Sequence, residues 1–428
     1  MEKVIIKKLK GITGQVVVPA DKSISHRSVI LGAISRGRTE IHNFLESEDC
    51  LWTVDVFKRL GVEIETAKLS LIVKGRGLRG LKKAAGALYF GNSGTGLRLT
   101  AGVLSGSPFV SILTGDDSLS KRPMKRITMP LRQMGAVIAG KEDADYLPLE
   151  VKGRGLRAID YQSPIASAQV KSSILLAGLY AEGTTTITEP FKSRDHTERM
   201  LSRFGADLKV EGLSISLRPG PELAADKVEI PSDISSASFF MVAAAILKNA
   251  ELCLKGVGVN PTRIGIIEIL KAMQADIQVT NISSDSFEPQ ADIIVKSKGL
   301  KPFKIDGNLI PRLIDEIPVL MVAATQADGE SIIKDAAELR VKETDRINSM
   351  VRGLRKLGAS VNVTGNDVII KGPTVLKGNV VSSFGDHRTA MSMIIAGLAA
   401  EGETTVLDTA CIKTSFPGFM EVIFKLKR

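Results

Sequence analysis

The feature that most constrains this sequence of 428 residues is one arrangement that recurs six times. In each copy a short polar stretch precedes an apolar helical run, a small-residue turn and a β-rich segment. The copies follow at intervals of about 65 to 80 residues, which is long for a solenoid. The β-rich segments are expected at residues 39–44, 109–113, 184–188, 251–255, 331–334 and 404–407. The sequence therefore predicts one α/β unit used six times.

The polar stretch at the head of each apolar helix carries groups that suit a bound anion. The heads contain Lys22, Ser23, Ser25 and Arg27; Asn92, Ser93 and Thr95; Ser163, Ser167 and Gln169; Ser232, Asp233 and Ser235; Arg312 and Asp315; and Asp386, His387 and Arg388. A helix N-terminus offers free backbone N–H groups and a partial positive charge. Simple N-capping is the alternative, and it explains the Ser and Asp residues but not the Lys and Arg residues. The pattern favours a site for a heavily anionic small molecule.

Composition narrows the class of partner. The formal net charge of +10 is compatible with nucleic acid, a membrane surface or acidic metabolites. One Trp and four Tyr supply few stacking aromatics, so nucleic acid is disfavoured and an acidic small molecule is expected. Three scattered Cys fit neither a disulfide framework nor a metal site. No apolar run approaches 18 residues and the first residues do not resemble a signal peptide, so we expect a cytoplasmic protein without a membrane segment.

The length indicates two domains, because one hydrophobic core rarely serves so long a chain. Each repeat is interpreted as strand, helix, strand, helix, strand and strand, and three repeats are expected to share each core. The Pro- and Gly-rich stretch at residues 218–222 is the expected boundary, and a first strand near residues 4–9 is expected to return to the second half. The predicted domains are residues 1–13 with 222–428, and residues 14–221. Residues 15–18 and 228–230 are interpreted as the leading strands of the repeats that follow them.

Two charged stretches are candidates for chemistry. Leu119–Arg126 is predicted to be a basic loop that Pro123 stiffens. Glu338–Arg346 is the densest run of charge and precedes an amphipathic helix, with Arg346 just inside it. Alternating charges usually form surface ion pairs of little energetic value. Together with Asp315, however, carboxylates beside Lys and Arg suit proton transfer. His387 is interpreted either as a base or as a packed histidine.

Six motifs together resemble those of the 5-enolpyruvylshikimate-3-phosphate synthase family. They are Asp21–Arg27, Gly91–Thr95, Lys121–Pro123, Ser167–Gln169, Arg340–Arg346 and Asp386–Arg388, in the family's order and spacing over essentially the whole chain. The resemblance implies a two-domain inverted α/β barrel of six βαβαββ repeats, with the active site in the interdomain cleft. It implies transfer of the enolpyruvyl group of phosphoenolpyruvate to the 5-hydroxyl of shikimate-3-phosphate, a step of chorismate and aromatic amino acid biosynthesis. It also implies a monomer that needs no metal or other cofactor.

The resemblance assigns roles to individual residues. Asp315 would accept the 5-hydroxyl proton, and Glu343, assisted by Lys22, would shuttle the proton at the enol methylene carbon. The residues that would hold shikimate-3-phosphate are Lys22, Ser23, Arg27, Ser167, Ala168, Gln169, Arg194, Asp315 and Lys342. Those that would hold phosphoenolpyruvate are Lys22, Gly94, Arg122, Gln169, Arg346 and Arg388.

Three positions qualify the resemblance. Ala168 stands where many members have a second serine, and Arg194 is expected to compensate for the missing hydroxyl. Lys413 sits one residue off the lysine of the family's last motif, where this chain has Thr414, so a catalytic role for Lys413 is not expected. Gly94 is the small residue of glyphosate-sensitive members, so inhibition by glyphosate that competes with phosphoenolpyruvate is expected.

Two other functions are weighed. The sister family that transfers enolpyruvyl to UDP-N-acetylglucosamine typically has Lys-Asn at the first head and a cysteine on a mobile loop. Here the head is Lys22-Ser23, and residues 114–126 contain no Cys. An RNA-binding or RNA-end-processing protein built from α/β repeats is the alternative from another class.

Overall fold

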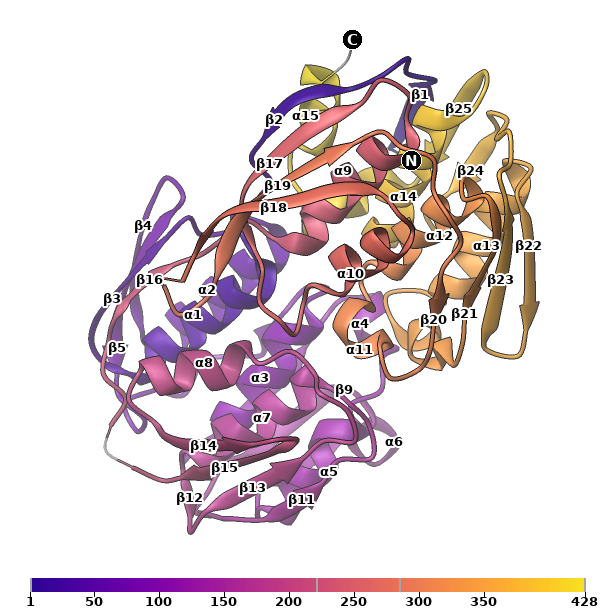
Figure 1. Ribbon diagram of the computed structural model, residues 1–428. Coiled ribbons are helices and arrows are strands. Elements are labelled where there is room, and N and C mark those ends of the chain that lie inside the picture. The colour runs from indigo at the N-terminus through magenta and orange to yellow at the C-terminus, as the bar shows by residue number, and fades with distance from the viewer. Residues whose placement is uncertain (1, 221, 285, 427–428) are drawn as a thin grey trace. The chain divides into compact units, whose positions relative to one another are not determined.

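The computed structural model describes residues 2–220, 222–284 and 286–426, which form two compact units (Figure 1). Unit 1 consists of Met1–Pro19, Pro231–Asp285 and Pro289–Arg428, and unit 2 of Ala20–Ile230 and Ser286–Glu288. Each unit combines three buried helices with three main sheets. The α/β repeat predicted from the sequence is therefore confirmed in both units.

Five four-stranded sheets share one topology, in which the first strand pairs parallel to the second and the remaining pairs are antiparallel. In unit 2 their orders are β16 (Lys227–Glu229), β3 (Arg36–His42), β5 (Ser70–Arg76), β4 (Glu63–Ala67); β6 (Leu88–Tyr89), β7 (Val110–Thr114), β9 (Tyr146–Lys152), β8 (Val137–Gly140); and β11 (Asp160–Gln162), β13 (Thr185–Thr188), β15 (Ser214–Arg218), β14 (Asp207–Glu211). A short pair, β10 (Leu156–Arg157) and β12 (Ala181–Glu182), accompanies them.

The sheets of unit 1 repeat this plan, with one exception. Their orders are β2 (Thr13–Val16), β17 (Glu251–Gly258), β19 (Gln290–Lys296), β18 (Asp276–Ser283); β20 (Lys304–Ile305), β21 (Gly329–Ile333), β23 (Asp367–Gly372), β22 (Ser360–Thr364); and β24 (Val380–Ser382), β25 (Glu403–Leu407), β1 (Lys3–Lys7). The third sheet has three strands, and the N-terminal strand β1 completes it by pairing antiparallel to β25. The six predicted β-rich segments correspond to β3, β7, β13, β17, β21 and β25.

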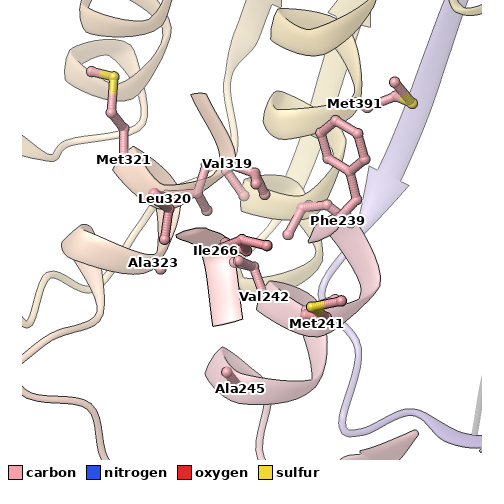
Figure 2. Packing of buried hydrophobic residues seen from close by; sticks show 14 of the residues in the cluster. Phe239, Met241, Val242, Ala245, Ile266, Val319, Leu320, Met321, Ala323 and Met391 are labelled. Atoms are coloured by element: carbon pink, nitrogen blue, oxygen red, sulfur yellow. The ribbon is translucent and has the colours of Figure 1, made fainter. Parts of the chain in front are cut away.

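The six apolar runs form helices that are buried on nearly all sides. They are α1 (Lys22–Ile34), α3 (Gly94–Ser105) and α7 (Ala168–Gly178) in unit 2, and α9 (Ile234–Ile246), α12 (Ile317–Thr325) and α14 (His387–Ala399) in unit 1. In unit 1, Phe239 and Val242 of α9, Val319 and Leu320 of α12 and Met391 of α14 belong to one hydrophobic core (Figure 2). Removing such apolar surface from water is the main stabilising contribution to each unit.

The more amphipathic helices lie between the second and third strands of their repeats. They are α2 (Glu48–Arg59), α5 (Lys125–Gln133), α8 (His196–Arg203), α10 (Gly265–Ala272) and α13 (Arg346–Lys356), and α15 (Phe419–Lys425) follows β25. Shorter helices are α4 (Asp117–Ser120), α6 (Lys141–Ala144), α11 (Ile310–Leu313), η1 (Ala336–Val341) and η2 (Thr409–Thr414). Gly205 and Gly358 follow the C-terminal ends of α8 and α13 and have φ of +86° and +91°, the left-handed backbone that glycine adopts without penalty.

The expected boundaries after residues 13 and 221 are wrong by several residues. The chain passes between the units after Pro19 and after Ile230, because β2 still pairs with β17 of unit 1 and β16 still pairs with β3 of unit 2. These two strands are the ones interpreted as leaders of the helices that follow them. Each instead completes a sheet of the other unit, so the leading strands are exchanged where the chain crosses after Pro19 and after Ile230. Local sequence does not specify this, because strand pairing is a long-range choice.

The basic stretch at residues 119–126 is also not a continuous loop. Its first two residues end α4, its last two begin α5, and only residues 121–124 link the helices. Asp116 caps α4 by accepting a hydrogen bond from the backbone N–H of Leu119 at 2.7 Å. Arg122 and Pro123 are therefore held between two helix ends.

Candidate active-site clusters

The head of α1 in unit 2 contains a cation that is held by a carboxylate. Asp21 caps this helix by accepting a hydrogen bond from the backbone N–H of Ile24 at 2.9 Å. Lys22 is the first residue of the helix, and its Nζ lies 2.7 Å from Oδ2 of Asp49 on α2. The Lys22 side chain is 18% exposed, so a ligand can still reach its ammonium group.

Arg27, one and a half turns further along α1, is held mainly by neutral oxygens. Its Nε donates to Oγ1 of Thr197 at 2.7 Å, its Nη2 to Oγ of Ser172 at 2.9 Å and its Nη1 to the carbonyl of Ser23 at 2.9 Å. Burial lowers the pKa of Arg27 to about 10, partly offset by the nearby carboxylate of Glu198. The guanidinium therefore stays charged at neutral pH while its position is fixed from α1, α7 and α8.

The head of α3 brings two guanidinium groups against a glycine. A Cβ at Gly94 would lie 2.6 Å from Nη1 of Arg98 and 3.3 Å from Nη1 of Arg122. Arg122 also donates through Nη2 to the side chain of Asn92 and, at 3.3 Å, to Oγ of Ser118. The small residue at position 94 therefore lets backbone and cations approach the same point, as an anion site at a helix N-terminus requires.

The head of α7 is tied to the head of α3 by one side chain. Gln169 accepts a hydrogen bond from Nη1 of Arg98 at 2.8 Å and donates to Oγ1 of Thr95 at 2.9 Å. Ser167 caps α7 through its hydroxyl, whereas Ala168 offers no polar side chain at the next position. The predicted residues of these two heads are thus brought together in unit 2.

Arg194 lies on the connection between β13 and α8, next to Ser193 and Asp195, and is partly exposed. Its charge acts on Arg27, where it contributes to lowering the pKa of that residue. Two arginines from separate elements therefore act on each other in unit 2. Such a pair of like charges is expected to attract an anion of high charge.

Unit 1 contains a cluster of a different kind, centred on a buried arginine. Arg346 binds three carboxylates: Nε lies 2.8 Å from Oδ2 of Asp386, Nη1 lies 3.1 Å from Oδ1 of Asp315, and Nη2 lies 2.5 Å from Oε2 of Glu343. Burial lowers the pKa of Arg346, but the carboxylates of Asp386, Glu343 and Asp315 outweigh it and raise the net pKa. Asp315 and Glu343 remain 16% and 20% exposed, so both can reach a substrate.

Arg388, on α14, also contacts the carboxylate of Asp315. Its Nε lies 3.2 Å from Oδ1 of Asp315, and its Nη1 donates to the backbone carbonyl of Asp315 at 3.2 Å. Asp386 caps α14 by accepting hydrogen bonds from the backbone N–H groups of Arg388 and Thr389 at 2.7 and 3.0 Å. One aspartate thus serves both the helix cap and Arg346.

Lys342 completes the cluster on the segment between η1 and α13. Loss of solvation lowers its pKa to about 8, although the carboxylates of Asp315, Glu338 and Glu343 act in the opposite direction. The ammonium group therefore loses its proton just above neutral pH. Asp315, Glu343, Arg346 and Arg388 form one connected set in unit 1, and Lys342 interacts with its charges electrostatically.

Lys413 lies apart from this set, as its offset in the last motif predicts. Its side chain is 59% exposed and pairs with Glu2 at 3.3 Å. The neighbouring Thr414 places Oγ1 3.5 Å from Nδ1 of His387. Lys413 therefore takes no part in the cluster.

Sequence reasoning missed residues that hold the predicted ones. Asp49 pairs with Lys22, and nothing in its local sequence distinguishes it from an ordinary helix-starting acid. His26 is buried within α1, and its Nδ1 lies 2.8 Å from Oγ1 of Thr53 on α2. Burial, followed by Lys22 and Arg27, lowers the pKa of His26 well below its usual value, so the ring is neutral. A histidine inside an apolar helix was a signal for such a partner.

Among the residues that the structure describes, no helix is long and apolar enough to cross a membrane. Within the same ranges, no three His, Cys, Asp or Glu side chains are grouped so that they could hold a metal ion.

Comparison with known proteins gives a full-length match. The model of the family EPSP synthase (3-phosphoshikimate 1-carboxyvinyltransferase) matches residues 6–423. A 3-phosphoshikimate 1-carboxyvinyltransferase of Bacillus anthracis is 51% identical over 98% of this chain and 97% of its own. One of Bacillus thuringiensis (strain Al Hakam) is 50% identical over 100% of both chains.

Solved structures agree with this match. An EPSP synthase from Acinetobacter baumannii has a TM-score of 0.88 and 47% identity, covering 99% of this chain and 98% of its own. The enolpyruvyl transferase NikO from Streptomyces tendae has a TM-score of 0.81 at 17% identity, covering 99% and 97%, and supports the fold alone. This chain has the enolpyruvyl transferase fold and belongs to the EPSP synthase family.

Proposed function

We infer that this protein transfers the enolpyruvyl group of phosphoenolpyruvate to the 5-hydroxyl of shikimate-3-phosphate and releases phosphate, as a 3-phosphoshikimate 1-carboxyvinyltransferase of aromatic amino acid biosynthesis. The observation that carries the inference is the family match over residues 6–423 together with the motif residues that both clusters contain. We further propose that residues of both units contribute to one active site, and that the enzyme acts as a cytoplasmic monomer without nucleic acid.

The charges of the two substrates explain the cations. Two phosphates and two carboxylates carry about five or more negative charges, at up to about −2 for each phosphate. Without Lys and Arg around them, the two substrates would repel each other. We assign shikimate-3-phosphate to Lys22, Ser23, Arg27, Ser167, Ala168, Gln169 and Arg194 of unit 2 and to Asp315 and Lys342 of unit 1. Ala168 contributes only backbone and a methyl group.

Phosphoenolpyruvate is assigned to residues of both units, most of which lie at the heads of helices. Gly94, Arg122 and Gln169 of unit 2, with Lys22, would bind it together with Arg346 and Arg388 of unit 1. The close approach of Arg122 to Gly94 supports this assignment, because phosphate is bound well by backbone N–H groups and a guanidinium together.

The carboxylates of unit 1 supply the proton transfers. Asp315 would take the proton of the 5-hydroxyl as the oxygen attacks C2 of phosphoenolpyruvate, while a proton is added to C3 with Glu343 and Lys22 assisting. A tetrahedral intermediate results. Its collapse expels phosphate and returns the C3 proton, so each group acts once as donor and once as acceptor. Arg346 and Arg388 supply the positive charge that an Asp315 carboxylate needs when it is partly removed from water.

The test is an assay of inorganic phosphate release with both substrates, each substrate alone, and UDP-N-acetylglucosamine in place of shikimate-3-phosphate. We expect release only when shikimate-3-phosphate and phosphoenolpyruvate are both present. Release with UDP-N-acetylglucosamine would instead favour the sister activity. Salt-dependent retention on RNA without any phosphate release would favour the nucleic-acid-binding function.

A further inference from the structure

Unit 2 contains a buried triad of charges to which the proposed reaction gives no role. Nζ of Lys171 lies 2.7 Å from Oε2 of Glu189 and 2.7 Å from Oε1 of Glu198. The three side chains are 0%, 1% and 5% exposed. Burial lowers the pKa of Lys171, but the two carboxylates raise it further, so the ammonium stays charged. One cation and two anions are therefore held away from water in a single cluster.

Glu189 begins the connection that carries Arg194. Residues 189–195 lie between β13 and α8 and form neither helix nor strand. Glu189 closes this connection on itself, because its Oε1 accepts from Oγ of Ser193 at 2.5 Å and its Oε2 accepts from the backbone N–H of Ser193 at 3.4 Å. Lys171 joins the closed turn to α7. The residue before Arg194 is thus fixed to the interior of the unit through one carboxylate.

Glu198 ties the other end of the same connection. It lies on α8, just after the connection ends, and its Oε2 is buried without a hydrogen bond to any residue that the structure describes. Its contact with Lys171 is what compensates its charge. Lys171 therefore holds both flanks of the segment that carries Arg194, one through Glu189 and one through Glu198.

The adjacent residues of the same two helices hold Arg27. Ser172 follows Lys171 on α7, and Thr197 precedes Glu198 on α8. Their hydroxyls lie 2.6 Å apart, and both receive hydrogen bonds from Arg27. The triad bridges α7 and α8. The hydrogen bonds of Arg27 to Ser172 and Thr197 therefore depend on the same distance between these two helices.

Stability alone does not account for such a triad. Taking ions out of water is costly, and replacing a buried ion cluster by apolar residues of similar volume is often neutral or stabilising. What a buried ion cluster adds is a fixed geometry among the elements that it joins. Here those elements are α7, α8 and the connection that bears Arg194.

We propose that Lys171, with Glu189 and Glu198, is a positioning residue for Arg194 and Arg27, and so for the binding of shikimate-3-phosphate. The proposal rests on the proposed function, which assigns both arginines to that substrate. The triad touches no substrate and acts through the two guanidinium groups. Its loss would misplace them while leaving the carboxylates of unit 1 and the arginines assigned to phosphoenolpyruvate, Arg122, Arg346 and Arg388, in place.

The test is the double variant Lys171→Met/Glu198→Gln. It removes one positive and one negative charge, so the net charge of the triad is unchanged, while the contacts of Lys171 with both carboxylates are lost. We expect the KM for shikimate-3-phosphate to rise about tenfold, with kcat and the KM for phosphoenolpyruvate within about twofold, because a shifted guanidinium loses a charge-assisted bond. Hydrogen exchange of residues 189–195 should accelerate in the free enzyme. Leu176→Ala, also buried on α7, is the control for general destabilisation and should leave both KM values unchanged.

A double-mutant cycle tests whether the triad acts through Arg194. Arg194→Ala should raise the KM for shikimate-3-phosphate less in the double variant than in the wild type, because the arginine there is already misplaced. Fully additive effects, an equal rise of both KM values, or unchanged exchange of residues 189–195 would overturn the proposal. If the wild type releases no phosphate from the two substrates, the proposed function fails. The exchange measurement still decides whether the triad orders the connection.

Discussion

The arginines proposed to bind substrate are held differently in the two units. In unit 2, Arg27 and Arg122 are bound by hydroxyl, amide and carbonyl oxygens, which fix a guanidinium without cancelling its charge. In unit 1, Arg346 is surrounded by three carboxylates, two of which are accessible. This difference fits the proposed roles of the two units. We propose that the arginines of unit 2 bind phosphate, and that the carboxylates of unit 1 transfer protons next to a bound anion.

The largest expected effect is at the proton-transfer cluster. Asp315→Asn keeps the shape of the side chain but removes the base, so kcat should fall by about 10²- to 10⁴-fold with smaller changes in KM. Initial rates of phosphate release measure this. Asp328→Asn, which breaks an exposed ion pair with Lys301 in the same unit, is the matched control and should keep wild-type kcat. A kcat for Asp315→Asn within about threefold of the wild-type value would contradict the assignment of Asp315 as the base.

The next largest effect is expected from removing Arg122, a cation of unit 2 that we propose binds the phosphate of phosphoenolpyruvate. Arg122→Ala should raise the KM for phosphoenolpyruvate about 10- to 100-fold, since it removes one charge-assisted hydrogen bond to the substrate. The KM for shikimate-3-phosphate should change less. Steady-state kinetics with each substrate varied in turn separates the two. Arg132→Ala, which disrupts a partly exposed pair with Asp143 on the outside of unit 2, should change neither, and an equal effect of both variants would argue against a specific site.

A smaller effect is expected from closing the space at the head of α3. Gly94→Ala places a methyl group against Arg98 and Arg122, so it should raise the KM for phosphoenolpyruvate by up to about tenfold. Glyphosate should inhibit the wild type in competition with phosphoenolpyruvate and inhibit this variant less. Gly155→Ala is the control, because a Cβ there meets nothing within 4 Å. Indifference of the wild type to millimolar glyphosate would contradict the assignment of phosphoenolpyruvate to this head.

The last expected effect is a pH dependence of kcat/KM that the ionisation of Lys342 in unit 1 causes. The pKa of Lys342 is lowered to about 8, so the positive charge is present below pH 8 and is lost as the pH rises through that value. The kcat/KM for shikimate-3-phosphate should therefore fall above about pH 8, approaching tenfold per pH unit if the charge is essential. Lys342→Arg keeps the charge and should move the fall beyond about pH 10, since a guanidinium keeps its proton there. A profile of Lys342→Arg that coincides with the wild type would assign the ionisation to another group.

The sequence predicted most of the repeat and most of the two clusters. The six buried helices, their polar heads and the second strand of each repeat follow from local periodicity and capping, as at Asp21 and Asp386. The exchange of β2 and β16 could not be predicted, because it depends on which distant strand each one pairs with. Local patterns specify an element better than they specify its partner.

The sequence also did not predict which residues would form hydrogen bonds and ion pairs with the candidate site residues. Asp49, Thr197 and Glu198 are ordinary helix residues in the sequence, and they matter only because folding places them beside Lys22, Arg27 and Lys171. Lys171 offered one local signal, since it is the one charged residue inside the apolar helix α7. A fully buried lysine requires an acidic partner, but the sequence does not say which of the many carboxylates supplies it.

The central claim is that cations of unit 2 and carboxylates of unit 1 serve one pair of substrates. A crystal structure of the protein with shikimate-3-phosphate and phosphoenolpyruvate bound tests it most directly. We predict that Lys22 and Arg122 of unit 2 and Asp315 and Arg388 of unit 1 lie within hydrogen-bond distance of the same ligand pair. Ligands that contact residues of one unit only would contradict the account.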